Sequence, residues 1–395
     1  MNPNDNPLHQ QLQSDLNHLR DQNLLRSLRT LDAAGPLITR DGRQLINLAS
    51  NDYLGLSQHP RLIQAAQTAA ASFGVGSGAS RLVAGHLQPH HDAEHAFADF
   101  KHAQAALILG SGYLANHALL TAIADTDDLI LFDKLSHASI IDAARAANAT
   151  ARSFPHGDLQ RLDQLLTRLG PDARHRFIVT DSVFSMDGDA ADLPALADLA
   201  DQHHAHLIVD EAHGTGVLGN TGAGLTEQQD VTHRCLAIVS TASKALGSQG
   251  GIITGSRTLI DTLINRARSL IYTTAPPPAQ AALITEALSI LRDEPHHQQR
   301  LNTITRHVRT TLTDRGWQLP ELAPDCPTPI IPLIVSDTDK ALALARHLEH
   351  HHILAPAIRP PTVAPGTARV RLSLRADLTD HHIEQLLTTL GPKPS

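Results

Sequence analysis

The sequence is poor in cysteine and has no long apolar run. Its 395 residues include only Cys235 and Cys326, which cannot form a disulfide framework, and neither lies in a CxxC pair. No apolar stretch approaches the ~18 residues of a membrane-spanning helix. The first residues, MNPNDNPLHQ, lack the basic and apolar regions of a signal peptide. We therefore expect a soluble, cytoplasmic protein in a reducing compartment, without a membrane segment.

Lysine is also scarce. The chain has 32 Lys and Arg together and 26 His, and only five of the 32 are lysines, which leaves 27 arginines. The formal net charge of -8 argues against a nucleic-acid-binding protein, because such proteins need a basic surface. A hydrophobic fraction of 42% permits a sizeable core and excludes disorder for most of the chain.

Short apolar runs recur along the middle of the chain, with segments of helical spacing between them. A polar segment with leucines at helical intervals, 8–31, predicts a leading helix that ends before Gly35-Pro36. The apolar runs lack polar alternation, so we predict an α/β fold with a mostly parallel sheet covered on both faces. The predicted strands are 105–109, 129–132, 177–179, 206–209, 236–239 and 251–254, and the clearest helices between them are 158–169 and 193–203.

A proline-rich stretch, 275–278, separates this pattern from a different one. Two helix-like segments follow it, and then the strand-like segments 330–335 and 368–374. We predict three parts: an N-terminal helix and lead-in segment (1–48), a large cofactor-binding domain (49–285) and a smaller α+β domain (286–395).

Polar residues follow the predicted strands, where ligands bind in open α/β sheets. Lys244 comes just after an apolar strand, where burial can lower its pKa, as a Schiff-base lysine requires. Thr241 and Ser243 offer hydroxyls for an anion, and Asp210 ends another apolar strand, where a carboxylate is costly unless it meets a cation. Pyridoxal phosphate satisfies all three, because it has an aldehyde, a protonated pyridine nitrogen and a phosphate.

The motifs around these residues resemble those of the α-oxoamine synthases, a family of fold-type I pyridoxal-phosphate enzymes. The resemblance extends from about residue 20 to 390. It rests on SNDYLGL at 50–56, GSG at 76–78 with Ser80-Arg81, LSHAS at 135–139, VFSMDGD at 183–189, VDEAHGTGV at 209–217, Ser243-Lys244, AIRPPTV at 357–363 and GTARVR at 366–371.

The resemblance implies roles around the cofactor ring. Lys244 holds the cofactor covalently and later moves the proton on the substrate Cα, while Asp210 pairs with the pyridinium. His137 stacks on the ring and also contacts substrate, and Ser185 and His213 hydrogen-bond the ring oxygen. The implied catalytic set is Lys244, His137, Asp210 and His213.

Other implied contacts hold the phosphate and the substrates. Gly112 and Tyr113, at a strand-to-helix turn, bind the phosphate with Thr241. Thr273 and Thr274 reach the phosphate from the partner subunit, which implies a homodimer with shared active sites. The implied substrate-binding residues are Asn51, Arg359 and Arg371 for carboxylate, and Thr362 and Arg26, or Arg29 in place of Arg26, for the acyl thioester.

The implied activity is decarboxylative condensation of an amino acid with an acyl thioester. The closest motif agreement is with members that join L-alanine to pimeloyl-CoA or the pimeloyl carrier-protein ester. A sister enzyme of glycine acetyltransferase, 5-aminolevulinate synthase or serine palmitoyltransferase type is the alternative. This alternative stays open because acyl-chain length is set by pocket walls that one sequence does not show, and the choice between CoA and carrier-protein thioester stays open as well.

Histidine clusters suggest a competing metal-binding protein without this activity. HDAEH at 91–95 fits the HxxEH pattern of inverted zinc proteases, but 26 histidines make chance pairs common and no third ligand stands out. His296-His297 and the triple 350–352 are better explained as solvated helix ends or loops. The glycine-rich 74–78 lacks the preceding strand of a dinucleotide fingerprint and predicts an active-site loop. We therefore predict no metal.

Overall fold

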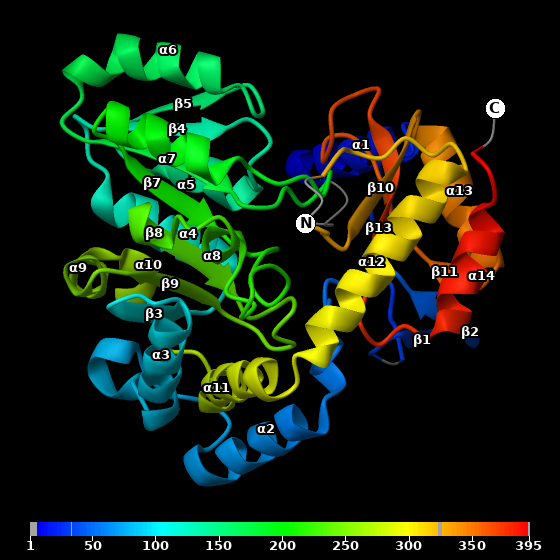
Figure 1. The fold of residues 1–395 in the computed structure, drawn as a ribbon, viewed down its shortest axis with the longest axis horizontal. Coiled ribbons are helices and arrows are strands. Elements are labelled where there is room, and N and C mark those ends of the chain that lie inside the picture. The colour runs from blue at the N-terminus through cyan, green and yellow to red at the C-terminus, as the bar shows by residue number, and fades with distance from the viewer. Residues whose placement is uncertain (1–5, 33, 323–325, 394–395) are drawn as a thin grey trace.

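The computed structural model describes residues 6–32, 34–322 and 326–393, which form two lobes (Figure 1). The larger lobe is built on a seven-stranded sheet in the order β3-β9-β8-β7-β6-β4-β5. The strands are β3 (Ala105–Leu109), β4 (Leu129–Asp133), β5 (Thr150–Phe154), β6 (Arg176–Asp181), β7 (His206–Asp210), β8 (Cys235–Thr241) and β9 (Gly251–Gly255). In this sheet β9 is antiparallel to both of its neighbours, β3 and β8, and all other strand pairs are parallel. The predicted α/β fold with a mostly parallel sheet is confirmed.

Both faces of the sheet are buried, as the unbroken apolar runs predict. Along β4, Leu129 and Leu131 point into one apolar cluster, whereas Ile130 and Phe132 point into the other. One face is covered by α4 (Gly112–Ile123), α5 (Ala138–Ala146), α9 (Arg257–Arg266) and α10 (Arg268–Ile271). The other is covered by α3 (Gln88–Phe100), α6 (Leu159–Leu169), α7 (Leu193–Gln202), α8 (Leu225–Gln228) and α11 (Pro278–Asp293). α2 (Pro60–Phe73) packs outside α11.

The smaller lobe contains two three-stranded sheets. One has the order β10-β13-β12, from β10 (Ile330–Ser336), β12 (Ala357–Ile358) and β13 (Ala368–Ser373). The other joins the N-terminal strands β1 (Leu37–Arg40) and β2 (Arg43–Asn47) to β11 (Ile353–Leu354). Helices α12 (His296–Asp314), α13 (Thr338–His350) and α14 (Asp380–Leu390) pack on them. The segment before residue 48 therefore pairs with the C-terminal part, and the predicted three-part division stays a prediction.

The leading helix is shorter than predicted. α1 spans Pro7–Asp21 and has no buried residue, so tertiary packing does not extend it. It ends because Asn23 takes the left-handed conformation, with φ 56°, and the N–H groups of Leu24 and Leu25 both donate to the Leu19 carbonyl. The expected helix over 8–31 is therefore wrong beyond residue 21.

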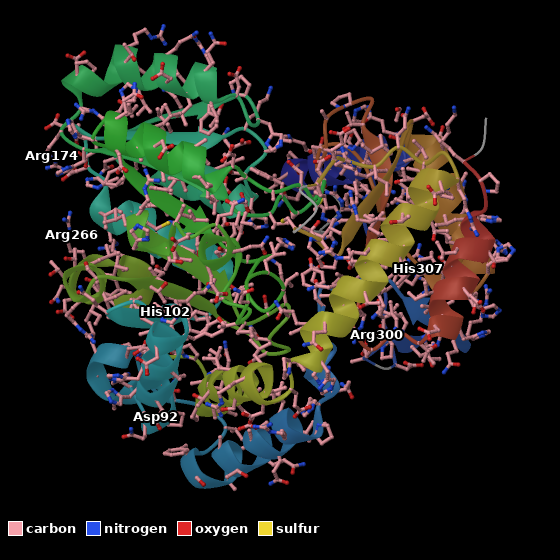
Figure 2. The ribbon with its side chains drawn as sticks, viewed as in Figure 1. Asp92, His102, Arg174, Arg266, Arg300 and His307 are labelled. Atoms are coloured by element: carbon pink, nitrogen blue, oxygen red, sulfur yellow. The ribbon has the colours of Figure 1, made fainter. Side chains whose placement is uncertain are left out.

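The charged and histidine side chains lie mostly on the outside. Asp92, His102, Arg174 and His307 are exposed on both lobes (Figure 2). Within the described residues, no helix is both long and apolar enough to cross a bilayer.

Candidate active site

A cavity of about 250 Å³ lies at the carboxyl edge of the large sheet. Four neighbouring strands, β4, β6, β7 and β8, end here, and α4 begins here. Parallel strands place their last residues at one edge, so residues far apart in sequence meet. The lining residues are Ser111, Gly112, Tyr113, His137, Ser139, Asp181, Asp210, Ala212, His213, Thr241, Ser243 and Lys244.

Lys244 follows β8 and lines this cavity. Desolvation lowers the pKa of its amine to about 8, although the carboxylates of Asp210 and Asp181 act in the opposite direction; Arg371 lowers it further. The amine is therefore far more often neutral near pH 7 to 8 than an exposed lysine. A neutral amine is the form that attacks an aldehyde or accepts a proton.

Asp210, at the end of β7, is buried and held in place from two sides. Its Oδ2 accepts a hydrogen bond of 2.6 Å from Nδ2 of Asn116, on α4, and its Oδ1 accepts one of 2.8 Å from the N–H of Ala212. Asn116 also donates to Ser139 Oγ at 2.9 Å. The sequence analysis did not find Asn116, because a helical asparagine inside an apolar stretch carries no motif.

Asp181 is a second buried carboxyl, on β6 directly beside Asp210 in the sheet. Its pKa is raised well above its usual value by burial and by the neighbouring Asp210. It also accepts a hydrogen bond of 2.9 Å from the main-chain N–H of His137. Asp181 therefore fixes the start of α5, and it too was missed from sequence.

His137 caps α5 and presents its ring to the cavity. Its Nδ1 lies 2.7 Å from Ser139 Oγ and accepts from the Ser139 N–H at 3.2 Å. Desolvation lowers its pKa, with Lys244 acting in the same direction. A neutral, oriented imidazole on the cavity wall suits stacking against a planar ligand.

The start of α4 provides an anion cradle at one end of the cavity. Ser111 caps the helix by accepting from the Leu114 N–H at 3.2 Å. Gly112 begins the helix close to Thr241, whose Oγ1 lies 2.8 Å from Ser243 Oγ. N–H groups of a helix first turn and nearby hydroxyls are the donors that phosphate prefers.

The smaller lobe contacts this site from behind His213, which lines the cavity. His213 is buried, and its Nδ1 lies 2.7 Å from the hydroxyl of Tyr53. Burial and the positive charges of Lys244 and Arg371 lower its pKa well below the usual value. Arg371, on β13, donates to Asn51 Oδ1 at 3.0 Å and to the Ser185 carbonyl at 2.5 Å. Tyr53 thus links the two lobes at the site. It lies in the SNDYLGL motif at 50–56, but the sequence predicted no role for it.

A second group of predicted residues assembles from the N-terminal segment and the smaller lobe. Arg26 donates to Thr362 Oγ1 at 3.0 Å, and Arg359 donates to the Leu25 carbonyl at 3.2 Å. Burial and the nearby charge of Arg26 lower the pKa of Arg359. Arg29 instead lies near Arg40, whose pKa its charge lowers. The structure therefore brings Arg26, not Arg29, to the other predicted thioester contacts.

Three of the predicted cofactor-binding residues are outside the cavity lining of their own chain. Thr273 and Thr274 are exposed, and Ser185 meets the site through its carbonyl, the acceptor of the Arg371 hydrogen bond. Their predicted roles stay predictions.

His156 forms a clamp that sequence reasoning missed. Its Nδ1 contacts Asp133 at 3.1 Å and its Nε2 contacts Asp189 at 2.7 Å. Hydrogen bonds to these two carboxylates raise its pKa to about 10. The imidazolium thus joins the end of β4 to the segment 184–189. A histidine between a strand and a glycine gave no signal, because both partners are distant in sequence.

The glutamate of the HxxEH segment, Glu94, has a structural role. Both oxygens of Glu94 accept from Arg81 at 2.9 Å, and Oε1 also accepts from the Ile108 N–H at 2.8 Å. The rings of His91 and His95 meet edge to face, with their centres 4.3 Å apart and their planes at 60°. A glutamate held by arginine and a strand is not available as a catalytic base, so the resemblance of this segment to a zinc-protease motif gives no support to the metal-binding alternative.

Comparisons with known proteins agree with this geometry. Residues 43–390 match the family described as aminotransferase class I and II. A putative 8-amino-7-oxononanoate synthase of Geobacillus kaustophilus (strain HTA426) is 44% identical over 93% of both chains. An 8-amino-7-oxononanoate synthase of Alkalilimnicola ehrlichii is also 44% identical, over 93% of this chain and 92% of its own.

Solved structures have the same fold. Serine palmitoyltransferase from S. paucimobilis superposes with a TM-score of 0.90 at 27% identity, over 96% of this chain and 95% of its own. The 8-amino-7-oxononanoate synthase from Francisella tularensis gives a TM-score of 0.75 at 30% identity, over 88% and 96%.

Proposed function

The chain belongs to the class I and II aminotransferase family, and we propose that it condenses L-alanine with a pimeloyl thioester, releasing CO₂ and forming 8-amino-7-oxononanoate. The observation that carries this proposal is the 41–44% identity, over 90% or more of the chain, to relatives named for this product. The resemblance found from sequence motifs is confirmed. The reaction is an acyl transfer and belongs to biotin synthesis.

The cofactor is pyridoxal phosphate, and the residues at the site fit it. The cavity combines an amine of lowered pKa, a rigidly held carboxylate and a helix start with hydroxyls. When bound, the cofactor supplies an electron sink for negative charge that develops at the substrate Cα. Lys244 would hold it, Asp210 would keep its ring nitrogen protonated, and Gly112, Tyr113 and Thr241 would hold its phosphate. The fold is that of the fold-type I pyridoxal-phosphate transferases.

The remaining chemistry falls to side chains already in place. The Lys244 amine, neutral above about pH 8, accepts the Cα proton and later returns it. His137 and His213 are neutral, so they place no positive charge near Asp210 that would compete with the protonated ring nitrogen for this carboxylate. The Arg371 guanidinium, oriented by Asn51, binds the substrate carboxylate in bidentate geometry.

The acyl thioester would enter beside the 26–362 contact. Arg26 and Thr362 are exposed and hydrogen-bonded to each other, so both can reach a polar acyl donor. Arg359, next to them, adds a second guanidinium. A carboxylate-ended acyl chain matches two adjacent arginines better than a plain alkyl chain does.

We also propose a homodimer with shared sites. Thr273 and Thr274 are exposed beside Tyr272, which is 72% exposed, and in the dimer Thr273 and Thr274 of the partner subunit would complete the phosphate cradle. Mixed dimers of the Lys244→Ala chain with a Thr273→Ala, Thr274→Ala chain test this. One site of each mixed dimer then has both parts intact, so activity should return on mixing; no recovery in verified mixed dimers would contradict the shared site.

The substrate assignment is tested with a matrix of amino acids and thioesters. Alanine, glycine and serine are each paired with pimeloyl, succinyl, acetyl and palmitoyl thioesters, on CoA and where available on carrier protein, and CO₂ release is measured. We expect alanine with a pimeloyl thioester to give the highest kcat/KM. A preference for serine with palmitoyl-CoA would instead favour the activity named for the S. paucimobilis structure.

A further inference from the structure

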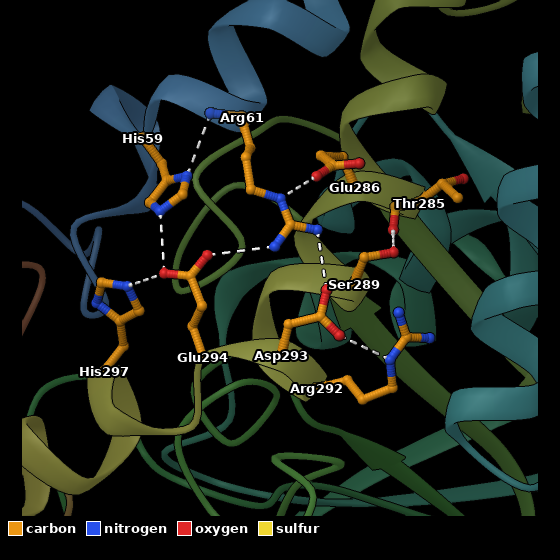
Figure 3. Close-up of polar contacts among 9 residues, drawn as sticks. All are labelled: His59, Arg61, Thr285, Glu286, Ser289, Arg292, Asp293, Glu294 and His297. Carbon is orange, nitrogen blue, oxygen red and sulfur yellow. Dashed lines mark hydrogen bonds and ion pairs between the residues drawn. The ribbon is translucent and has the colours of Figure 1, made fainter.

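Two histidines and a glutamate meet at a place remote from the active-site cavity. His59 caps the start of α2, Glu294 follows α11, and His297 lies in the first turn of α12. Figure 3 shows both imidazoles directed at one carboxylate. Their ligand atoms all lie within 4.8 Å of one another, and this is the one such group of three among the described residues.

The distances are too long for good hydrogen bonds. Nε2 of His59 and Nε2 of His297 each lie 3.4 Å from Glu294 Oε2, whereas N–H···O bonds in proteins cluster at about 2.7–3.2 Å. Nε2 of His297 is buried and makes no hydrogen bond of accepted geometry. An unsatisfied, buried ring nitrogen beside a carboxylate needs an explanation.

The two nitrogen–oxygen distances of 3.4 Å suit a metal ion, and the two histidine nitrogens lie within 4.8 Å of each other. Zinc binds histidine nitrogen and carboxylate oxygen at about 2.0–2.1 Å in a tetrahedral arrangement, which places neighbouring ligand atoms ~3.3–3.4 Å apart. Two histidines and one glutamate form a recognised zinc ligand set, with water in the fourth position. The three side chains keep 16%, 26% and 23% exposure, so the group as a whole is open to solvent, although Nε2 of His297 is itself buried.

We propose that His59, Glu294 and His297 bind a divalent transition metal ion, with Zn²⁺ as the expected occupant. Imidazole and carboxylate together favour zinc and its borderline neighbours over magnesium or calcium. The site shares no residue with the catalytic cavity, so the ion is structural and takes no part in the condensation.

Arg61 orients the Glu294 carboxylate and also makes a hydrogen bond that metal binding would break. It donates to Glu294 Oε1 at 3.2 Å, Glu286 at 2.6 Å and Asp293 at 3.1 Å, so it holds the carboxylate with Oε2 turned toward the histidines. Its N–H donates to His59 Nδ1 at 3.3 Å. A metal on Nε2 moves the remaining ring proton to Nδ1 and ends this cap, so metal binding loses one hydrogen bond at the start of α2.

The location gives the ion a mechanical role. α11 belongs to the large lobe, and α12 runs from it into the small lobe (Figure 1). The ion would connect the start of α2 to the joint between α11 and α12. Because it binds the folded chain, it should raise thermal stability, and the rise should continue with the logarithm of the free metal concentration once that exceeds the Kd.

The test uses tag-free holoenzyme, dialysed free of unbound cofactor, with Zn²⁺ alone in equilibrium dialysis and Co²⁺ for visible d–d absorption. We expect one tight equivalent per chain and a tetrahedral cobalt spectrum. His297→Gln and Glu294→Gln should each weaken binding ~10-fold or more, since even loss of an outer-shell partner costs that much. The matched control is His91→Gln, His95→Gln, which removes another close histidine pair and should keep the tight equivalent.

Two outcomes would overturn the proposal. One is the absence of a stoichiometric tight equivalent in the unaltered holoenzyme. The other is a tight equivalent that survives both His297→Gln and Glu294→Gln. Cofactor absorbance and turnover, measured on every variant, should match those of the unaltered enzyme and confirm that each variant folds.

Discussion

Replacing His156 by glutamine should destabilise the protein in a pH-dependent way. His156 bridges Asp133 and Asp189 and packs edge-on against Phe184, with ring centres 4.4 Å apart. Glutamine can keep a hydrogen bond to one aspartate but not the positive charge between the two. Asp133 is buried at 2% exposure, so it loses its cationic partner where water replaces it poorly.

The size of the effect follows from the pKa. A rise from 6.5 to about 10 corresponds to at most ~4.8 kcal/mol, at ~1.36 kcal/mol per unit. The side chain is 31% exposed, and solvent screening reduces this to ~2–3 kcal/mol. With an unfolding entropy of ~2.1 cal/mol/K per residue, 395 residues give a Tm decrease of ~1.2 °C per kcal/mol, or ~3 °C in total.

The sign with pH is fixed by linkage. The folded-state pKa lies above the unfolded value, so this stability is fully present below pH 6.5 and is lost as the pH rises toward about 10. The Tm difference between the unaltered protein and His156→Gln should therefore be largest at pH 6 and shrink steadily through pH 7, 8 and 9.

Differential scanning fluorimetry of the holoenzyme across this pH range provides the assay. His307→Gln, a change at an exposed histidine of α12 (Figure 2), is the matched control and should leave Tm unchanged at every pH. A His156→Gln difference that stays constant from pH 6 to pH 9 would refute the charged clamp and leave a packing role.

Four further predictions concern the site. The rate at which the apo-chain takes up pyridoxal phosphate should rise with pH and level off above about pH 8, because the reacting Lys244 amine has that pKa; a flat stopped-flow profile would contradict it. Arg371→Lys should raise KM for alanine ~10-fold or more, because bidentate binding is lost. A larger effect on the KM for the thioester would contradict the assignment of Arg371 to the amino-acid carboxylate. Arg26→Ala should raise the thioester KM more than Arg29→Ala does, and equal effects would reject the Arg26 assignment. Lys101→Met should lower kcat and shift the cofactor absorption band, and Lys101→Arg should show the same two defects. An unaltered spectrum in Lys101→Met would show that Lys101 contributes to stability alone.

The sheet was predictable because both of its faces are buried. Each predicted run became a strand, since apolar residues at every position leave no solvent face. β5 was missed because it is an edge strand with a largely exposed sequence, TARSF. The reversed direction of β9 was not predictable either, since direction depends on the short 242–250 connection and not on the strand's own composition.

The site was only partly predictable for a similar reason. Lys244 and Asp210 follow apolar strands directly, so sequence position alone placed them at the carboxyl edge. Tyr53 reaches His213 across 160 residues, and Asn116 reaches Asp210 across 94. Such contacts depend on the packing of separate elements, which one sequence does not encode locally.

The pair Asp210-Glu211 explains why a second buried lysine is needed. Consecutive residues at a strand end point to opposite faces, so Asp210 faces Lys244, whereas Glu211 turns to the other side, where it is fully buried. There it accepts from Ser182 Oγ at 2.8 Å and from the Thr226 N–H at 2.6 Å. Two neutral donors do not balance a buried carboxylate charge.

Lys101 provides the balance. It is buried, it donates to Thr215 Oγ1 at 3.0 Å and to the Ala223 carbonyl, and Glu211 is the main charge that opposes the lowering of its pKa by burial. Both acceptors belong to the segment that begins at His213, so the amine holds that segment from behind while His213 forms the cavity wall in front. An arginine here would bring a wider, planar group into a space closed by Thr215 and Ala223. Of the five lysines in a chain with 27 arginines, Lys134, Lys340 and Lys393 are exposed, whereas the other two supply a compact buried cation: Lys244 for chemistry, and Lys101 to position the segment that carries His213.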